Sequence, residues 1–470
     1  MTYVERTAAP DLATVLAPLA ARAAGAEEAT LVSATVPVAP VDPIALHGMA
    51  RPLGASLWLQ PQAGVAIVGI GEAWSARQSH EARFEIISVA WRMLLDGAII
   101  EPGDAPPEAG PVLLGGFAFD DEPVESETWL GFEAGCMTLP ALTLSTTPAG
   151  SWLTASVVVE PEGVPPATLI GSLDQTWAYL AEAPVQPSGP ARQSLAVRRR
   201  TPDAAAWHAS VARLAGAVGR GRLDKAVLSR EITLQAASDI DITGVLRRLE
   251  ASAPESTVFA FTRGPRTFIG ATPERLVSLR GRELRTMAMA GSARRADDPA
   301  EDVALAEQLL ASDKEREEHE VVVQMLRGAL APVTDELEIP RRPQVARFRH
   351  VQHLVTPVSG RLRDDADVLT LVERLHPTPA VGGTPRQLAL ELISEEEPHE
   401  RGWYAGPLGW ISRDGGGEFV VALRSGVIRG AGVTLFAGCG IVADSDPARE
   451  WDESSAKLQA LGSALGPFEP

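Results

Sequence analysis

The chain has 470 residues, of which 45% are hydrophobic and 22% are charged, and its formal net charge at pH 7 is -19. This apolar fraction supports a folded protein with a large core and excludes an intrinsically disordered chain. The negative charge comes without a compensating basic block, which argues against nucleic acid or an anionic membrane surface as a partner.

The chain also lacks the sequence features of secreted and membrane proteins. Two cysteines, Cys136 and Cys439, are too few for a disulfide framework or a thiolate metal cluster. The first residues, MTYVERTAAPDLA, show no basic segment followed by an apolar one, and no apolar run reaches the length of about 18 residues that a membrane span needs. We therefore expect a cytoplasmic protein.

Short strand patterns separated by proline and glycine turns fill the first half of the chain. Strands are predicted at 64–71 and 111–120, and a hairpin at 148–150 joins TLPALTLSTT to SWLTASVVVE. One helix is predicted at 81–97, because apolar residues recur there at helical spacing and Gly97 ends the pattern.

In the second half of the chain, the predicted helices and strands follow one another more closely. The stretch AEAPVQPSGPARQ reads as a linker, and LGWISRDGGGEFVVALRSG predicts a hairpin around its glycine-rich turn. The elements predicted between them are a helix near 203–219, strands at 224–231, 257–263 and 267–280, and one long helix over 298–330. Clusters of strands with helices between them, and no regular βαβ rhythm, predict an α+β protein with largely antiparallel sheets.

Lys225 stands out in the strand DKAVLSRE at 224–231. Alternate side chains of a strand share a face, so Lys225 lies on the same face as Val227. Its ammonium group either reaches solvent at the strand end or serves a site, and the strand pattern leaves both open.

Two predicted helices carry spaced carboxylates. Glu315 and Glu318 are neighbours on one helix face, and Glu450, Glu453 and Lys457 form a polar stripe on another helix. Either set alone fits a solvated helix face. If the two sets converged, their repulsion would require a cation, and all-oxygen ligands favour Mg²⁺ over zinc.

Further candidates could recognise anions or move protons. Arg424 lies on an apolar strand, where a guanidinium needs a carboxylate or phosphate partner from the protein or from a ligand. Gly438 and Gly440 either expose backbone N–H groups to a carboxylate or make a plain turn. Glu274 follows Pro273 in an apolar strand, where a partly buried carboxyl group resists ionisation and can act as a general acid.

Other motifs carry less information. VGIGEAW lacks the third glycine of a dinucleotide-binding loop. Structural roles are expected for residues without a nucleophile signature, namely His319, His350, His353 and Cys439. His376 stays open, because Pro377 and the following glycines make a rigid loop around it.

Taken in order, these segments resemble the chorismate-utilising enzymes, which include isochorismate, anthranilate, aminodeoxychorismate and salicylate synthases. The segments that carry the resemblance are KAVLSRE, GATPERL, MAGSARR, KEREEHEVVV, HPTPAVGGTPR, RGWYAGPLGW, FVVALRSG and GCGIVADSDPAREWDES, followed by Lys457. They extend from about residue 203 to 463, whereas the N-terminal half matches loosely, through GGFAFD.

The resemblance implies a fold in which two largely antiparallel β-sheets pack as a sandwich flanked by helices. Length alone would suggest two or three domains. The family pattern implies instead one structural domain, in which residues 1–200 complete the sandwich of the catalytic region at 201–463.

The resemblance also implies a ligand set. Mg²⁺ would be held by Glu318 and Glu453, with Glu315 and Glu450 alongside through water, and would bind the ring carboxylate of chorismate. The enolpyruvyl carboxylate would contact Arg424, Tyr404 and the amides near Gly438 and Gly440. Lys457 would reach a carboxylate from the metal side, and His376 would lie near the ring. The implied site is completed by Ala380, Gly291 and Ser292.

Three positions, Lys225, Ala290 and Ala380, imply one activity within the family. Lys225 would be the general base for water attacking ring C2, and Glu274 would protonate the departing C4 hydroxyl. Ala290 stands where aminodeoxychorismate synthases tend to carry a nucleophilic lysine, and Ala380 stands where anthranilate and salicylate synthases usually show threonine. The resemblance thus implies an isochorismate synthase that acts as a monomer without an amidotransferase subunit, and it favours menaquinone over siderophore biosynthesis.

Three alternatives stay open at this point. An aminating synthase would need a glutamine amidotransferase partner and ammonia. A salicylate synthase would release pyruvate. A chorismate-binding module without activity is disfavoured, because every catalytic position is filled.

Overall fold

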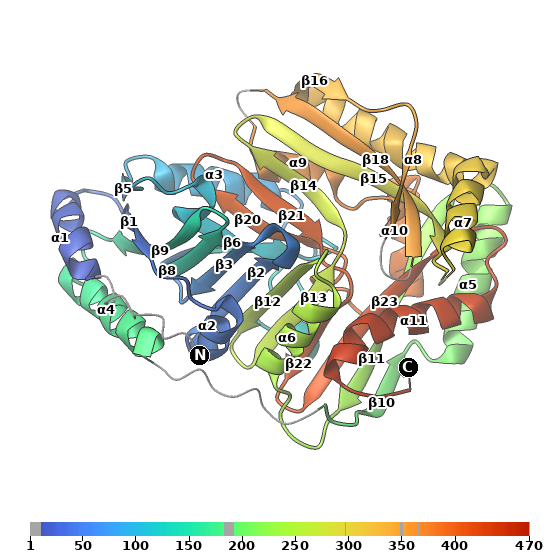
Figure 1. The fold of residues 1–470 in the computed structure, drawn as a ribbon, viewed down its shortest axis with the longest axis horizontal. Coiled ribbons are helices and arrows are strands. Elements are labelled where there is room, and N and C mark those ends of the chain that lie inside the picture. The colour runs from blue at the N-terminus through green and yellow to red at the C-terminus, as the bar shows by residue number, and fades with distance from the viewer. Residues whose placement is uncertain (1–10, 183–191, 297, 348–350, 364–365, 470) are drawn as a thin grey trace.

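Two large β-sheets pack face to face in the computed structural model, with helices on their outer surfaces (Figure 1). The structure describes residues 11–182, 192–296, 298–347, 351–363 and 366–469. Most of the predicted linker and His350 lie outside these residues. The predicted α+β sandwich with largely antiparallel sheets is confirmed.

The first sheet has 13 strands among the described residues. In spatial order these are β10 (Ala196–Thr201), β11 (Lys225–Gln235), β23 (Gly432–Ile441), β22 (Ser425–Arg429), β13 (Arg266–Thr272), β12 (Thr257–Arg263), β2 (Ala55–Gln60), β3 (Val65–Ile70), β8 (Leu142–Thr147), β9 (Gly150–Val159), β1 (Thr30–Val38) and β5 (Ile99–Glu101), with β19 (Gly383–Thr384) paired to β11. The pairing of β1 with β5 is parallel, whereas β11 pairs antiparallel with both β23 and β19.

The second sheet has 10 strands in the same part of the chain. In spatial order these are β16 (Thr334–Glu338), β18 (Val351–Leu362), β15 (Glu283–Arg294), β14 (Arg275–Arg280), β21 (Gly417–Val421), β20 (Pro407–Ser412), β6 (Val112–Phe117), β7 (Gly135–Leu139) and β4 (Trp74–Gln78), with β17 (Gln344–Arg347) paired to β18. Both sheets join the two halves of the chain, because β2 pairs with β12 and β6 pairs with β20.

Helices cover both sheets. They are α1 (Leu12–Ala23), α2 (Pro43–Ala50), α3 (Arg83–Leu95), α4 (Pro166–Glu182), α5 (Ala204–Gly219), α6 (Ile242–Ser252), α7 (Pro299–Ala311), α8 (Asp313–Leu330), α9 (Val368–Leu375), α10 (Arg386–Glu396) and α11 (Pro447–Leu465). Short 3₁₀ turns occur at Arg51–Leu53, Pro61–Ala63, Pro107–Ala109, Glu127–Trp129 and Ala331–Val333. Within the described ranges, no helix combines the length and the apolar character that crossing a membrane requires.

The core is divided by the sheets. Aromatic side chains of β12 and β13 meet between the two sheets, whereas Phe117 of β6 packs on Phe84 of α3 on the other face of the second sheet, where α8 and α9 add their apolar faces. Helices α1, α2, α4 and α6 cover the other face of the first sheet, and α5 and α10 pack on β11 and β23. Helix α11 contacts β23, so its polar stripe is fixed beside the strand that carries Gly438 and Gly440.

Both predicted hairpins form, as β8–β9 and β20–β21, and the helix predicted at 81–97 is α3. Two predicted elements are wrong. The run 267–280 is two strands, β13 in the first sheet and β14 in the second, because the chain crosses between the sheets at Pro273 and Glu274. The predicted helix 298–330 is α7 and α8, since Ser312 leaves the helical conformation and its side chain accepts a hydrogen bond from the Glu315 N–H at 3.3 Å.

Candidate active site

Lys225 is the first residue of β11, where it pairs with Thr384 of β19. On the other side, the same strand pairs with β23, and Val227 lies opposite Gly440. A Cβ added at Gly440 would lie 2.4 Å from Cε and 3.1 Å from Nζ of Lys225. The lysine side chain therefore lies over the bare backbone of Gly440, a position that a larger residue would fill.

Glu274 lies at the crossing between the two sheets. Its N–H donates to Oγ1 of Thr272 at 3.2 Å, and its carbonyl accepts from the N–H of Val421 at 3.0 Å. Burial raises the pKa of the Glu274 carboxyl to about 7, and the positive charges of Lys225 and Arg424 oppose this shift. Glu274 and Lys225 thus share one electrostatic environment although they come from different strands.

Arg424 is not on a strand, which corrects the sequence-based expectation. It lies in the connection between β21 and β22 with a φ of 51°, in the left-handed region that non-glycine residues rarely adopt. Burial lowers the pKa of its guanidinium, and the nearby Tyr404 and Glu274 act in the opposite direction. A non-glycine residue held in this sparsely populated backbone region is typical of a functional site.

Tyr404 and Lys457 approach Gly438 from two sides. A Cβ added at Gly438 would lie 3.3 Å from the Tyr404 hydroxyl, and Lys457 Nζ donates to the Gly438 carbonyl at 2.9 Å. The Lys457 ammonium also pairs with Oε1 of Glu453 at 2.7 Å. Burial raises the pKa of the Tyr404 phenol, which keeps it protonated as a hydrogen-bond donor.

A bulge in β15 brings this strand close to α8. The register shifts between Ala290 and Ser292, and Gly291 adopts a φ of 76°. A Cβ at Gly291 would lie 3.1 Å from Oε2 of Glu315, so α8 approaches the bulge closely. Across the ladder, Ser292 pairs with His353 of β18.

His353 is a site residue that sequence reasoning missed. Burial lowers the pKa of its imidazole, and the nearby charges of Arg424 and Lys457 lower it further. A hydrogen bond with the backbone of Gly291 opposes that shift. No local signal distinguished this histidine, because its place depends on the pairing of β18 with the β15 bulge.

His376 belongs to a different environment. Its Nε2 donates to the carbonyl of Phe119 at 3.0 Å, and its ring packs against Phe119 at 5.8 Å and Phe84 at 6.4 Å between centroids. Burial lowers the pKa of His376 to about 3, so the ring is neutral. The structure thus gives His376 a place in the core, whereas His353 shares the surroundings of Arg424.

The predicted metal ligands lie on two helices, Glu315 and Glu318 on α8 and Glu450 and Glu453 on α11. Their oxygen donors fit a hard divalent cation. In the described part of the chain, however, no three His, Cys, Asp or Glu side chains gather as metal ligands would. The four carboxylates thus do not form one cluster in that part of the chain, and their role as metal ligands stays a prediction.

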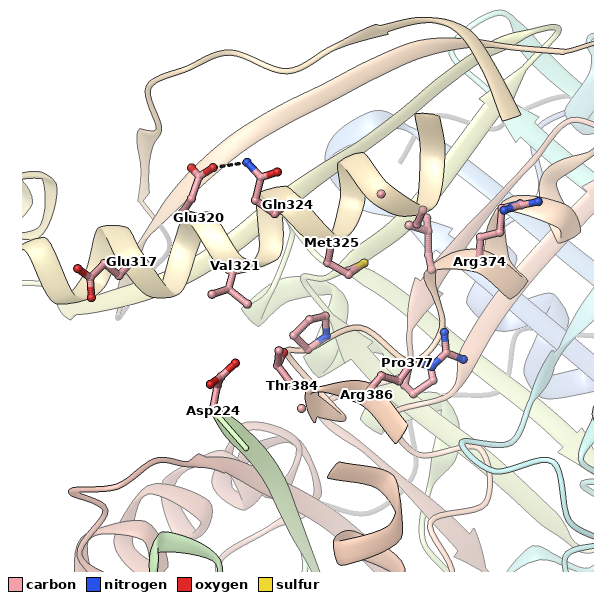
Figure 2. Close-up of a pocket in the computed structure, with 15 residues that line it drawn as sticks. Asp224, Glu317, Glu320, Val321, Gln324, Met325, Arg374, Pro377, Thr384 and Arg386 are labelled. Carbon is pink, nitrogen blue, oxygen red and sulfur yellow. Dashed lines mark hydrogen bonds between the residues drawn. The ribbon is translucent and has the colours of Figure 1, made fainter. Parts of the chain in front are cut away.

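A groove of about 780 Å³ opens beside Lys225. Figure 2 shows Val321, Gln324 and Met325 of α8 on one wall, with Asp224 and Thr384 facing them. The groove is lined by Asp224, Glu317, Glu320, Val321, Gln324, Met325, Gly328, Ala329, Arg374, Leu375, Pro377, Pro379, Gly383, Thr384 and Arg386. Met325 also borders a small cavity that contains Glu274, Thr378 and Ala380. The groove therefore adjoins the surroundings of both candidate catalytic residues.

Comparison with known proteins identifies the class. Residues 18–466 match the chorismate binding enzyme family, and the chain belongs to that family. It is 35% identical over 446 residues to the isochorismate synthase MenF of Bacillus subtilis, covering 93% of this chain and 94% of that protein. It is 37% identical over 441 residues to a salicylate biosynthesis isochorismate synthase of Pseudomonas aeruginosa, covering 93% and 90%.

Solved structures agree with this assignment. The menaquinone-specific isochorismate synthase MenF of Escherichia coli superimposes with a TM-score of 0.79 and 27% identity, covering 97% of this chain and 100% of that chain. Anthranilate synthase component I of Streptococcus pneumoniae superimposes with a TM-score of 0.70 and 20% identity over 85% and 92%, a likeness of fold alone.

Proposed function

We propose that this protein is an isochorismate synthase, which converts chorismate to isochorismate. The observation that carries the proposal is the buried carboxyl group of Glu274, whose pKa burial raises to about 7 while the charge of Lys225 acts on it. A carboxyl group that is half protonated near neutral pH is well suited to donate a proton. The identities to isochorismate synthases over 93% of the chain support the same activity.

In the proposed reaction, Lys225 accepts a proton from the water that attacks ring C2. Glu274 donates a proton to the C4 hydroxyl, which leaves as water while the ring double bonds shift. One water enters and one leaves, so the net change is an isomerisation without oxidation or reduction. At the end of the reaction Lys225 has gained a proton and Glu274 has lost one. Proton exchange with solvent returns both residues to their starting states.

The remaining residues bind the two carboxylates of chorismate. The enolpyruvyl carboxylate would accept charge-assisted hydrogen bonds from Arg424, from the Tyr404 hydroxyl and from the amides near Gly438 and Gly440. We place His353 beside this carboxylate, because its strand pairs with the β15 bulge and the charge of Arg424 acts on it. His376, first expected near the ring, lies in the core instead.

The divalent cation of this proposal is Mg²⁺. Glu318 and Glu453 would hold it, with Glu315 and Glu450 alongside. When bound, the cation would neutralise the ring carboxylate and so favour attack of water at ring C2. Lys457, which pairs with Glu453 at 2.7 Å, would orient that carboxylate side chain.

The experiment that tests the proposal is chromatography of the products formed from chorismate and MgCl₂, with and without ammonium. We expect isochorismate in both cases and no product after chelation with EDTA. Anthranilate or aminodeoxychorismate in the presence of ammonium would support an aminating synthase and contradict the proposal. Salicylate together with pyruvate, measured with lactate dehydrogenase, would support a salicylate synthase instead.

The proposed enzyme acts as a monomer without an amidotransferase subunit, and light scattering after gel filtration checks its mass. We assign its product to menaquinone biosynthesis. The match to all of the menaquinone-specific enzyme of Escherichia coli supports that assignment. The relative in salicylate biosynthesis is matched over 90% of its length, so neighbouring genes for either pathway provide the deciding observation.

A further inference from the structure

The loop that follows α9 separates the groove from the Glu274 cavity. Pro377 and Pro379 line the groove, whereas the alternate residues Thr378 and Ala380 line the cavity. Figure 2 shows Pro377 on the groove side, near Thr384. A small shift of this loop would therefore change both spaces at once.

Arg401 binds this loop and the strand β11 together. Its Nη1 donates to the carbonyl of Val381 at 2.8 Å, and its Nη2 donates to the carbonyl of Val227 at 2.6 Å. Val381 directly follows Ala380, and Val227 lies two residues after Lys225 on the same strand face. One guanidinium thus fixes the distance between the candidate base and the loop beside the candidate acid.

Glu397 completes the contact. Its Oε1 and Oε2 accept from Arg401 at 2.5 and 2.8 Å, and Oε1 also accepts from the N–H of Ser229 on β11 at 2.6 Å. The side chains of Arg401 and Glu397 are 2% and 4% exposed. Burying two charges is costly, and geometry that satisfies them this fully offsets the cost.

The N-terminal half of the chain supports the same loop. The guanidinium of Arg401 stacks over the ring of Phe119 at 4.1 Å, and the Phe119 N–H donates to the carbonyl of Gly402 at 2.7 Å. The carbonyl of Phe119 accepts from His376, where the loop begins. Phe119 therefore anchors the start of the loop while Arg401 holds it at Val381.

We infer that Arg401 is a positioning residue for the reaction proposed above, because its planar fork fixes Lys225 and the Ala380 loop in their working arrangement. A lysine would keep the positive charge, but it carries no planar fork to satisfy two carbonyls and a carboxylate together. The consequence for catalysis rests on the proposed function. The contact itself is testable without it.

The kinetic test compares Arg401→Lys with wild type. Misplacing a catalytic group by about 1 Å can cost about 10²-fold, so we expect kcat to fall by about 10²-fold while KM changes little. Arg266→Lys is the matched control, because Arg266 is also buried and donates to a backbone carbonyl, that of Glu127 at 2.9 Å. Its kcat should equal that of wild type.

The second readout is hydrogen exchange of the protein without substrate. The N–H groups of Val227 and Asp224 donate to the carbonyls of Gly382 and Thr384, both at 2.8 Å. In Arg401→Lys these two amides should lose protection, while those of the β12–β13 pair keep theirs. This readout needs no activity. If wild type makes no isochorismate, the proposed function fails and the exchange data still test the contact.

Glu397→Gln covers the case in which Arg401→Lys does not fold. Glutamine keeps an acceptor for Arg401 and removes the charge, so we expect the same losses to a smaller degree. Wild-type kcat and wild-type exchange in Arg401→Lys would show that the arginine merely neutralises Glu397, and would overturn the inference. A lower melting temperature with unchanged kcat would overturn it as well, by showing a role in stability alone.

Discussion

The surroundings of Arg401 and of Arg424 differ in how their charges are satisfied. Arg401 donates to two carbonyls and a carboxylate of the protein. For the Arg424 guanidinium, the described part of the chain provides the nearby Glu274 carboxyl and no hydrogen bond. A guanidinium that the protein satisfies is suited to hold backbone, whereas one left open is suited to bind an anion. Four predictions about activity, ordered from the largest effect to the smallest, and one about stability test the charged groups around Arg424.

The largest effect is expected for the two candidate catalytic residues. Lys225→Ala and Glu274→Gln should each lower kcat by about 10²- to 10⁴-fold, because each removes a general base or acid. Steady-state rates of isochorismate formation measure the loss, and circular dichroism checks that the fold is intact. Turnover within a few-fold of wild type in either variant would contradict the assigned roles.

A methyl group at Gly440 should disturb Lys225 without changing its chemistry. The added Cβ would lie 2.4 Å from Cε of Lys225, so the side chain must move in Gly440→Ala. We expect kcat to fall by about 10²-fold. Gly432→Ala on the same strand is the control, since the nearest atom to its added Cβ is 3.5 Å away. Equal rates for the two variants would show that the position of Lys225 is unimportant.

Arg424→Gly should separate substrate binding from stability. Removing a charged hydrogen-bond donor should lower kcat/KM by about 10- to 100-fold. Glycine tolerates the φ of 51° at this position, so the free energy of unfolding should rise by about 1 kcal/mol. Denaturant titration and kinetics measure the two effects. A loss of stability would instead give Arg424 the structural role that Arg401 has.

The smallest effect is a dependence on pH. The pKa of Glu274 is raised to about 7, and its protonated form is the acid in the proposed reaction. The value of kcat/KM should therefore fall as pH rises above about 7, by about tenfold per pH unit at most. A flat profile from pH 6 to pH 9 would contradict this role.

The same shift has a consequence for stability. Because the pKa of Glu274 is higher in the folded protein than its ordinary value of 4.5, folding takes up a proton between these values. Its contribution to stability is therefore most favourable at low pH and is lost as pH rises through about 7. Glu274→Gln should melt at a higher temperature than wild type at pH 8, with a smaller difference at pH 5.

Much of the fold followed from local signals. The glycine-rich turn around Gly415 formed as predicted, and Asp446 caps α11 with Pro447 at its first position; both signals act within a few residues. The apolar run at 267–280 led to the wrong prediction of a single strand, because its pattern continues through the point where the chain changes sheets. The break at Ser312 was missed because helical spacing of apolar residues continues on both sides of it.

The residues of the candidate site also differ in whether local sequence could identify them. Lys225, Glu274 and Arg424 are unusual in their local sequence, since each places a charge among apolar neighbours, and the structure brings them into one electrostatic environment. His353 and His376 could not be distinguished by local sequence. Their environments depend on the pairing of β18 with β15 and on the contact with Phe119, which lies 257 residues from His376.

Residue type and spacing were thus sufficient for most elements of the fold and for the charged groups that could carry chemistry, because turns, caps and periodicity act over short distances. They could not show that Arg401 bridges Val227 and Val381, 174 and 20 residues away in the chain. Nor could they show whether the carboxylates of α8 and α11 converge. Those arrangements follow from sheet pairing and helix packing, which join distant segments and leave no mark on local sequence.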